Sequence, residues 1–296
     1  MNVPLILEPG QLLARVAERT PPGLRKNVVV IGSIASVWAF RDVRGTGSVA
    51  TKDIDLLLQP AVDAVATAES LGAELLKEGW EPQYPNAVQP GTTDTLDDDL
   101  PALRLTPPDE PTPWFVELLG EPYPDQDERR SWRRIRTEAG DFGLPSFRYM
   151  RVAVHDAQQT EFGLRIARPS NMALAHLLEH SDPDRTPISS LTDRPPRFTK
   201  DVGRAIALWW LAGAQSPLAD ARWLEQWCQT LCEIYPDRPG EMREAARAGL
   251  GNVKNYLAGS HRLALNSVLG GHNVSLDAFK VAYDSLMRLV ERLSLP

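Results

Sequence analysis

The sequence predicts an α+β protein, in which a small mixed sheet with flanking helices is followed by a helical region. Two observations carry this prediction. Short apolar runs alternate with helical segments in the first half of the chain, and Gly and Pro residues separate them. After Arg168-Pro169-Ser170, the remaining pattern is helical. We therefore expect an α/β domain over residues 1–168 and a helical domain over residues 169–296.

The run NVVVI at residues 27–31 is β-branched and continuous, which is typical of a buried strand. Polar, Pro-rich or acidic stretches at 86–99, 107–113 and 181–197 are expected as loops or turns. Ser170 and Ser275 are expected to cap helices. The expected strands are 27–31, 53–58, 102–106, 114–119 and 164–167. The expected helices are 12–19, 33–41, 62–78, 171–180, 199–213, 218–234, 240–257 and 275–293.

Composition limits the class of protein. The net charge of the 296 residues is −7, which argues against a general nucleic-acid binder. Residues 1–150 hold 15 Lys+Arg and 23 Asp+Glu, whereas the remainder holds 17 and 16. No apolar run is long enough for a membrane span, and the start lacks the basic region of a secretory signal. Cys228 and Cys232, at helical spacing, are expected as core thiols, so we expect a cytoplasmic protein without a membrane partner.

A cradle for phosphate is predicted where the first strand meets a helix. Gly32-Ser33 follows the buried run directly, and a helix is expected to begin there. Glycine permits close approach of a ligand to the backbone, and a helix N-terminus offers unpaired N–H groups and a positive dipole end. The Ser33 hydroxyl adds a further donor.

Three acidic residues predict a metal site. Asp53 and Asp55 are two positions apart on an expected strand, so their side chains project to the same face. Two adjacent carboxylates repel each other, and a divalent cation such as Mg²⁺ removes this cost. Glu117 is a third acid inside the apolar run WFVELL. If its strand lies beside that of the aspartates, the three carboxylates complete a two-metal site.

These residues resemble the nucleotidyltransferase fold of the DNA polymerase β superfamily. The segments VVVIGSIASVWAF and VATKDIDLLL, together with Glu117, are similar to bacterial nucleotidyltransferases of the abortive-infection toxin type. In the helical half, Lys200-Asp201 with Arg204 matches a family helix that opens with Lys-Asp. The sequence departs from the family at His176, where relatives carry Lys, and at Val49, where they often carry Arg.

The resemblance implies an enzyme that moves a nucleoside monophosphate from an NTP to an acceptor hydroxyl on RNA, tRNA or a protein. It implies catalytic and metal-binding roles for Asp53, Asp55 and Glu117, with two Mg²⁺ ions as cofactor. It also implies that the nucleotide is bound by Gly32, Ser33, Lys52, Lys200 and Asp201. A toxin of this type would have an antitoxin partner. The departures at His176 and Val49 motivate an alternative: a non-catalytic relative that senses nucleotides or binds a partner.

Three other patterns have competing interpretations. Residues 45–50 fit G-x-G-x-x-A but precede a strand, so we expect a flexible loop instead of a dinucleotide site. His176, Glu179 and His180 fit the H-x-x-E-H pattern of a zinc peptidase, with Glu241 or Glu244 as a third ligand. The arginine-rich run RRSWRRIR at 129–136 is expected as a solvated helix, or else as a contact for a phosphate backbone.

Overall fold

The computed structural model describes residues 6–84, 89–108, 114–126, 128–183, 186, 188 and 195–294. The chain divides into two compact units. The sheet unit comprises Met1–Ile34 and Thr51–Ala167, and the helical unit comprises Ala35–Ala50 and Arg168–Pro296. Residues 35–50 therefore belong with the helices, whereas the sequence alone had grouped them with the α/β half.

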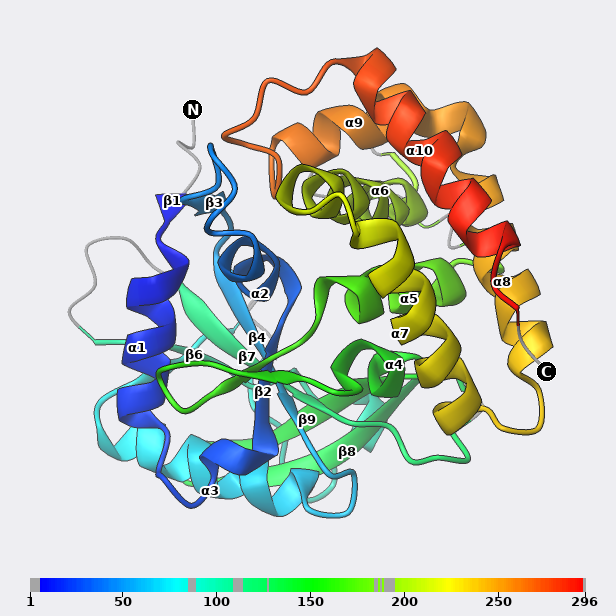
Figure 1. Cartoon of the computed structure of the whole chain (residues 1–296). Helices are drawn as coiled ribbons and strands as arrows, with labels where there is room; N and C mark the ends of the chain where they lie inside the picture. The colour runs from blue at the N-terminus through cyan, green and yellow to red at the C-terminus, as the bar shows by residue number, and fades with distance from the viewer. Residues whose placement is uncertain are drawn as a thin grey trace. The chain divides into compact units, whose positions relative to one another are not determined.

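The sheet unit is built on a mixed seven-stranded sheet, which confirms the predicted α+β class (Figure 1). The strand order is β10-β11-β2-β4-β7-β6-β5. β2 runs antiparallel to β4, while β4 and β7 are parallel. The strands of this sheet are β2 (Val28–Ile31), β4 (Asp53–Leu58), β5 (Glu81–Pro82), β6 (Arg104–Thr106), β7 (Phe115–Gly120), β10 (Gln158–Gln159) and β11 (Arg165–Ile166).

Helices and a hairpin flank this sheet. α3 buries side chains at helical spacing, from Ala64 through Leu71 to Leu75, and packs beside β8 (Figure 1). Central strand residues such as Ile54, Leu57 and Trp114 are almost fully buried. The remaining elements of this unit are β1 (Ile6–Leu7), α1 (Pro9–Arg19), α3 (Ala64–Lys77), β8 (Arg130–Thr137), β9 (Gly140–Phe147) and α4 (Met150–Val154).

The expected helix over the arginine-rich run is wrong, because these residues form the strand β8. β8 pairs antiparallel with β9 through a tight turn, in which Thr137 lies opposite Gly140. Gly140 has a φ of +118°, a conformation that favours glycine, and the Thr137 hydroxyl donates to the Gly140 carbonyl at 3.0 Å. Ile135 is fully buried in the hairpin. Strand alternation, which buries Ile135 and leaves Arg136 exposed, therefore prevails over the charge pattern.

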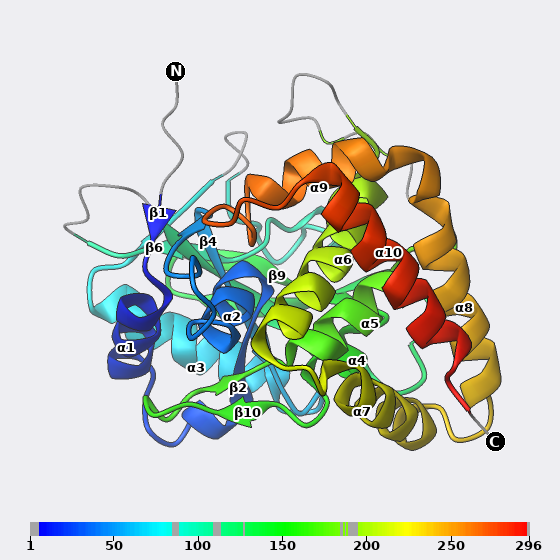
Figure 2. The ribbon, with the colours of Figure 1, turned by 45° about the horizontal axis from the view of Figure 1, so that its top comes forward.

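The helical unit packs around α6, which lies against α5, α9 and α10 (Figure 2). α6 is amphipathic, and its apolar stripe includes Val202, Ile206 and Trp209, all of which are buried. The helices of this unit are α5 (Pro169–Glu179), α6 (Arg197–Gln215), α7 (Ala219–Ile234), α8 (Pro239–Asn252), α9 (Leu257–Leu265) and α10 (Leu276–Glu291). α2 (Gly32–Ala39) begins in the sheet unit, and β3 (Val49–Ala50) belongs to the helical unit.

The loop that fits G-x-G-x-x-A is packed at its start. Gly45 has a φ of +95°, and a Cβ atom there would collide with the Gly271 carbonyl. The Thr46 hydroxyl lies 2.8 Å from Nε2 of His272. These contacts explain why residues 35–50 belong to the helical unit.

Two smaller predictions about the helical unit have different outcomes. Ser275 caps α10 as predicted, because its hydroxyl accepts from the Ala278 amide at 3.1 Å. Ser170 does not cap α5: Arg168 occupies the cap position, and the Ser170 side chain hydrogen-bonds to Gln226 from within the helix. Cys228 and Cys232 are free thiols of intermediate exposure, so their assignment to the core is wrong.

Several loop predictions fall partly outside the described residues, namely 86–88 of the acidic loop, 109–113 of the Pro-rich turn, and 184–185, 187 and 189–194 of the later connection. Asp127, which precedes the arginine-rich run, lies outside them too. Among the helices that are described, none has both the length and the apolar character needed to cross a membrane.

Two glycines of α8 provide a matched test of helix packing. A Cβ atom at Gly249 would overlap the Leu177 carbonyl of α5, whereas one at Gly251 would meet nothing within 4 Å. We expect Gly249→Ala to lower the free energy of unfolding by about 2 kcal/mol, because the helices must separate. Gly251→Ala should leave it unchanged or raise it by up to about 1 kcal/mol. Urea unfolding of both variants measures the difference, and equal stabilities would contradict the packing described here.

Candidate functional site

The pairing of β4 with β7 brings the three predicted acids to one face of the sheet. Asp55 lies directly opposite Glu117 in the parallel register, and Asp53 lies opposite Phe115. Because strand side chains alternate, Asp53, Asp55 and Glu117 project from the same face. Ile54 and Val116 point to the opposite face and are buried. The predicted adjacency of the two strands is therefore present, and the acids occupy the partly exposed first half of each strand.

Gly32 lies against the carboxylate of Asp55. The chain leaves β2 at Ile31, which is opposite Asp55 in the antiparallel register, and α2 begins at Gly32. Gly32 has a φ of +73°, and a Cβ atom there would collide with Oδ2 of Asp55. Glycine is thus required both by the backbone conformation and by this close approach. The arrangement brings the N-terminus of α2, including Ser33, next to the acidic pair.

The strand that carries the aspartates is braced at its start. The hydroxyl of Thr51 donates a hydrogen bond to Oδ1 of Asp53, and so orients that carboxylate. Lys52, between these two residues, is exposed to solvent. Lys52 is therefore accessible at the beginning of β4.

Arg104 forms an ion pair with Glu117 that was not predicted from the sequence. Arg104 on β6 is the register partner of Glu117 on β7. Its Nε and Nη2 atoms lie 3.0 and 2.9 Å from the same oxygen, Oε2 of Glu117. The neighbours Leu103 and Leu105 are fully buried on the other side of the sheet. Arg104 therefore turns to the face from which Asp53, Asp55 and Glu117 project, which we call the acidic face. This alternation within ALRLT was the available sequence signal.

Burial raises the pKa of Glu117, whose side chain is only 15% exposed. The charge of Arg104 opposes this rise, and the negative charge of Asp53 adds to it. Arg130 also favours the ionised form. The electrostatics of the acidic face thus couple Glu117 to one neighbouring acid and two arginines.

These side chains bear on the expected metal centre in two ways. Among the residues that the structure describes, no group of three or more His, Cys, Asp or Glu side chains stands close enough to hold a metal ion. With Glu117 held by Arg104, a three-carboxylate centre is not preassembled. Asp53 and Asp55 still fit Mg²⁺, because this ion commonly binds one or two carboxylates and completes its shell with water and phosphate oxygens.

The predicted residues of the second half lie in the helical unit. Lys200 is exposed on α6. Oδ2 of Asp201 is hydrogen-bonded to Nε2 of His180 at 3.0 Å, and the His180 side chain is only 1% exposed. The same carboxylate oxygen lies 3.8 Å from Nε of Arg197. Burial alone would raise the pKa of Asp201, but the hydrogen bond from His180 and the nearby His176 hold it well below its ordinary value. The Asp201 carboxylate is therefore engaged in linking α6 to the end of α5.

His176 stands where the nucleotidyltransferases named above carry a lysine, and it does not supply the positive charge of that lysine. Burial lowers the pKa of His176 to about 3, although Asp201 pulls in the opposite direction. The side chain is therefore neutral at pH 7. The zinc-peptidase interpretation also lacks geometric support here, since Nε2 of His180 faces Asp201 and the described residues contain no three-ligand cluster. Glu241 and Glu244 are exposed on α8, where Glu244 pairs with Arg243 at 2.9 Å.

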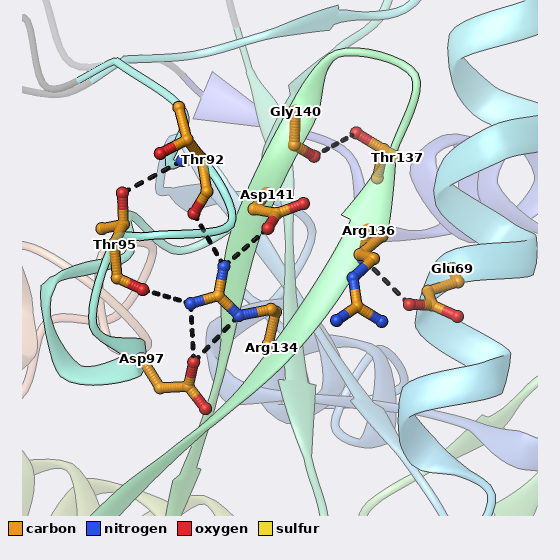
Figure 3. A network of polar contacts seen from close by, with 9 residues as sticks. All are labelled: Glu69, Thr92, Thr95, Asp97, Arg134, Arg136, Thr137, Gly140 and Asp141. Carbon is orange, nitrogen blue, oxygen red and sulfur yellow. Dashed lines mark hydrogen bonds and ion pairs between the residues drawn. The ribbon is translucent and has the colours of Figure 1, made fainter.

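The arginines of β8 differ in their availability to a ligand. Arg134 is surrounded by acceptors, as Figure 3 shows: Asp97, Asp141 at 2.6 Å, and the carbonyls of Thr92 and Thr95. Arg133 donates to two carbonyls, those of Ala61 and Glu121. These two guanidinium groups hold loops onto the hairpin. Arg136 is exposed, so the five arginines do not form one uniform phosphate-binding surface.

Comparison of this chain with protein-family models, with curated proteins and with solved structures finds no match.

Gly32 is the position where the site is most sensitive to an added methyl group. We expect Gly32→Ala to lower the free energy of unfolding by at least about 1–2 kcal/mol, because φ is positive and the Asp55 carboxylate must move. Gly23→Ala is the matched control in the same unit, since a Cβ atom there meets nothing within 4 Å. Urea unfolding should separate the two variants. If Gly32→Ala were as stable as Gly23→Ala, the close approach to Asp55 would be wrong.

The neutral state of His176 predicts a pH dependence. Its pKa is about 3 in the folded chain and about 6.5 in the unfolded chain, so only the unfolded chain binds this proton between those values. Stability should therefore fall as the pH drops from 6.5, by up to about 1.4 kcal/mol per pH unit from this group. Unfolding measured from pH 7 to 4.5 should show a shallower slope for His176→Gln. Identical slopes would contradict the neutral state of His176. The measurements stay above pH 4, because the pKa of Asp201 is lowered in the folded chain. The stabilisation that Asp201 contributes is therefore lost at lower pH.

Proposed function

We propose that this chain is an Mg²⁺-dependent nucleotidyltransferase with the nucleotidyltransferase fold, which moves a nucleoside monophosphate from an NTP to an acceptor hydroxyl. The observation that carries the proposal is the strand order β2-β4-β7. This order supports it by grouping Gly32-Ser33, the Asp53/Asp55 pair and Glu117. A helix N-terminus can bind the negatively charged phosphates, and a carboxylate pair can bind the positively charged metal ion. The two side by side therefore suit a metal-bound polyphosphate.

In this proposal, Asp53 and Asp55 hold Mg²⁺, and the amide groups at Gly32 and Ser33 bind the β- and γ-phosphates. When bound, the ion neutralises the charge of the phosphates during transfer. The acceptor hydroxyl releases its proton to solvent as its oxygen attacks the α-phosphorus in line, the bond to the bridging oxygen breaks, and pyrophosphate leaves. The chain acts mainly by positioning the reactants, with the orientation of Asp53 by Thr51 as one part of it.

The acceptor and the biological role rest on the resemblance described above. We infer that the acceptor is RNA, tRNA or a protein, and that the chain acts as the toxin of a toxin–antitoxin or phage-defence system. Lys52 is exposed at the start of β4 and is proposed to contact nucleotide phosphates. Lys200 is exposed on α6, and its contact with phosphate stays a prediction from the resemblance. Asp201 is proposed to support Lys200 indirectly, because its own carboxylate is engaged by His180.

A second candidate is a non-catalytic relative that binds a nucleotide without transferring it. Two observations favour it: His176 is neutral, and Glu117 is paired with Arg104. Such a protein would lack the lysine charge that the resemblance implies at position 176, and its third carboxylate, that of Glu117, would stay paired with Arg104. It would bind NTP and Mg²⁺, and it would leave the nucleotide intact.

A transfer assay distinguishes the two candidates. The purified chain is incubated with each α-labelled NTP, Mg²⁺, and either total cell RNA or lysate protein. We expect label to be transferred by the wild type, and to fall by about 100-fold or more in Asp53→Asn and Asp55→Asn, because each removes a carboxylate that holds the metal.

Asp63→Asn is the matched control, since Asp63 is an exposed acid of the same unit away from the acidic face. It should retain full transfer. Absence of transfer with any NTP, or equal transfer by Asp53→Asn, would overturn the enzymatic proposal. Calorimetric binding of NTP without turnover would then favour the non-catalytic candidate.

A further inference from the structure

The acidic face includes a positively charged side chain, that of Arg104. Arg104 contacts Oε2 of Glu117 through both Nε and Nη2, and its guanidinium lies 5.2 Å from the centre of the Phe115 ring. The Arg104 side chain is 29% exposed, about twice the exposure of Glu117. Arg104 therefore reaches solvent at the same face from which Asp53 and Asp55 project.

Charge balance favours the pairing of Arg104 with Glu117. Asp53, Asp55 and Glu117 bring three negative charges to one face of two adjacent strands, and Arg104 forms an ion pair with Glu117 at 2.9 Å. Without a cation, three carboxylates on adjacent strand positions would repel one another at a site of low solvent access. Arg104 supplies that cation within the sheet.

A bound metal–nucleotide would change this balance. The metal brings positive charge to the carboxylates, and the polyphosphate brings oxygens that match the planar fork of a guanidinium. Arg104 is in direct contact with Glu117. Arg130 acts on Glu117 through its charge, and Arg133 and Arg134 donate to carbonyl and carboxylate acceptors elsewhere in the sheet unit.

We propose that Arg104 exchanges partners: it pairs with Glu117 in the empty site and with a nucleotide phosphate in the loaded one, which releases Glu117 to the metal. This inference rests on the proposed function and deepens it. It makes Arg104 a nucleotide-binding residue, and it couples nucleotide binding to assembly of the three carboxylates.

The exchange predicts opposite effects of one substitution on two ligands. Arg104→Gln should bind Mn²⁺ alone about fivefold more tightly than the wild type, because Glu117 is released and a positive charge is removed. The same variant should bind non-hydrolysable NTP in Mg²⁺ about tenfold more weakly, because a charged hydrogen bond to phosphate is lost. Spin-resonance titration of Mn²⁺ and calorimetry of the NTP at pH 8 measure the two affinities.

Two controls separate this exchange from general effects. Arg136→Gln makes the same charge change at an exposed position of the same unit and should alter neither affinity. In the double variant Arg104→Gln/Glu117→Gln, the gain in Mn²⁺ affinity should disappear. Misfolding of Arg104→Gln would weaken both ligands together, and its urea transition identifies that case.

The outcomes distinguish the inference from the proposed function. If the wild type binds neither Mn²⁺ nor NTP in a manner sensitive to Asp53→Asn, the proposed function fails. If the wild type binds both but Arg104→Gln leaves NTP affinity unchanged, or lowers Mn²⁺ affinity while folded, the exchange by Arg104 is wrong and the proposed function stands. Opposite shifts that depend on Glu117 support the exchange.

Discussion

The parallel pairing of β4 with β7, with Asp55 opposite Glu117, is the constraint on which the rest of the candidate site depends. A shift of one residue in this register would turn Glu117 to the opposite face and leave it among buried apolar side chains. The register is held by side chains that alternate with the acids, such as Ile54 and Val116, which are buried on the other face. Apolar packing on one face thus determines which carboxylates meet on the other.

The antiparallel neighbour β2 adds the second part of the site. Because Ile31 lies opposite Asp55, the chain leaves β2 and enters α2 directly at the carboxylate. Only a residue without a side chain fits there, and Gly32 meets this requirement. The helix N-terminus and the acid pair are therefore adjacent for reasons of backbone geometry, whatever ligand they bind.

Polar groups within each unit are arranged to compensate buried charge. In the sheet unit, Arg104 accompanies Glu117, and Arg134 is enclosed by Asp97, Asp141 and two carbonyls. In the helical unit, His180 accompanies Asp201 while His176 remains neutral. A buried ion costs much free energy unless it is paired, so each of these pairs stabilises its unit only while both partners are present. Residues that a motif suggests as ligands, such as Asp201, can thus have a structural partner already.

The sequence by itself determined the α+β class, the positions of the central strands and the presence of an acidic pair on β4. These features follow from local periodicity, which needs no knowledge of the partner strand: DIDLLL alternates and NVVVI is continuous. Only the tertiary structure decided that RRSWRRIR is a strand, that residues 35–50 pack with the helical unit, and that Glu117 is paired with Arg104. Each of these depends on contacts that local sequence does not contain. β8 pairs with β9, and β6 pairs with β7. Gly45 packs against Gly271, and Thr46 contacts His272. Local propensity does not encode such pairings. The acids of the acidic face can therefore be identified from the sequence, but the side chains that pair with them cannot.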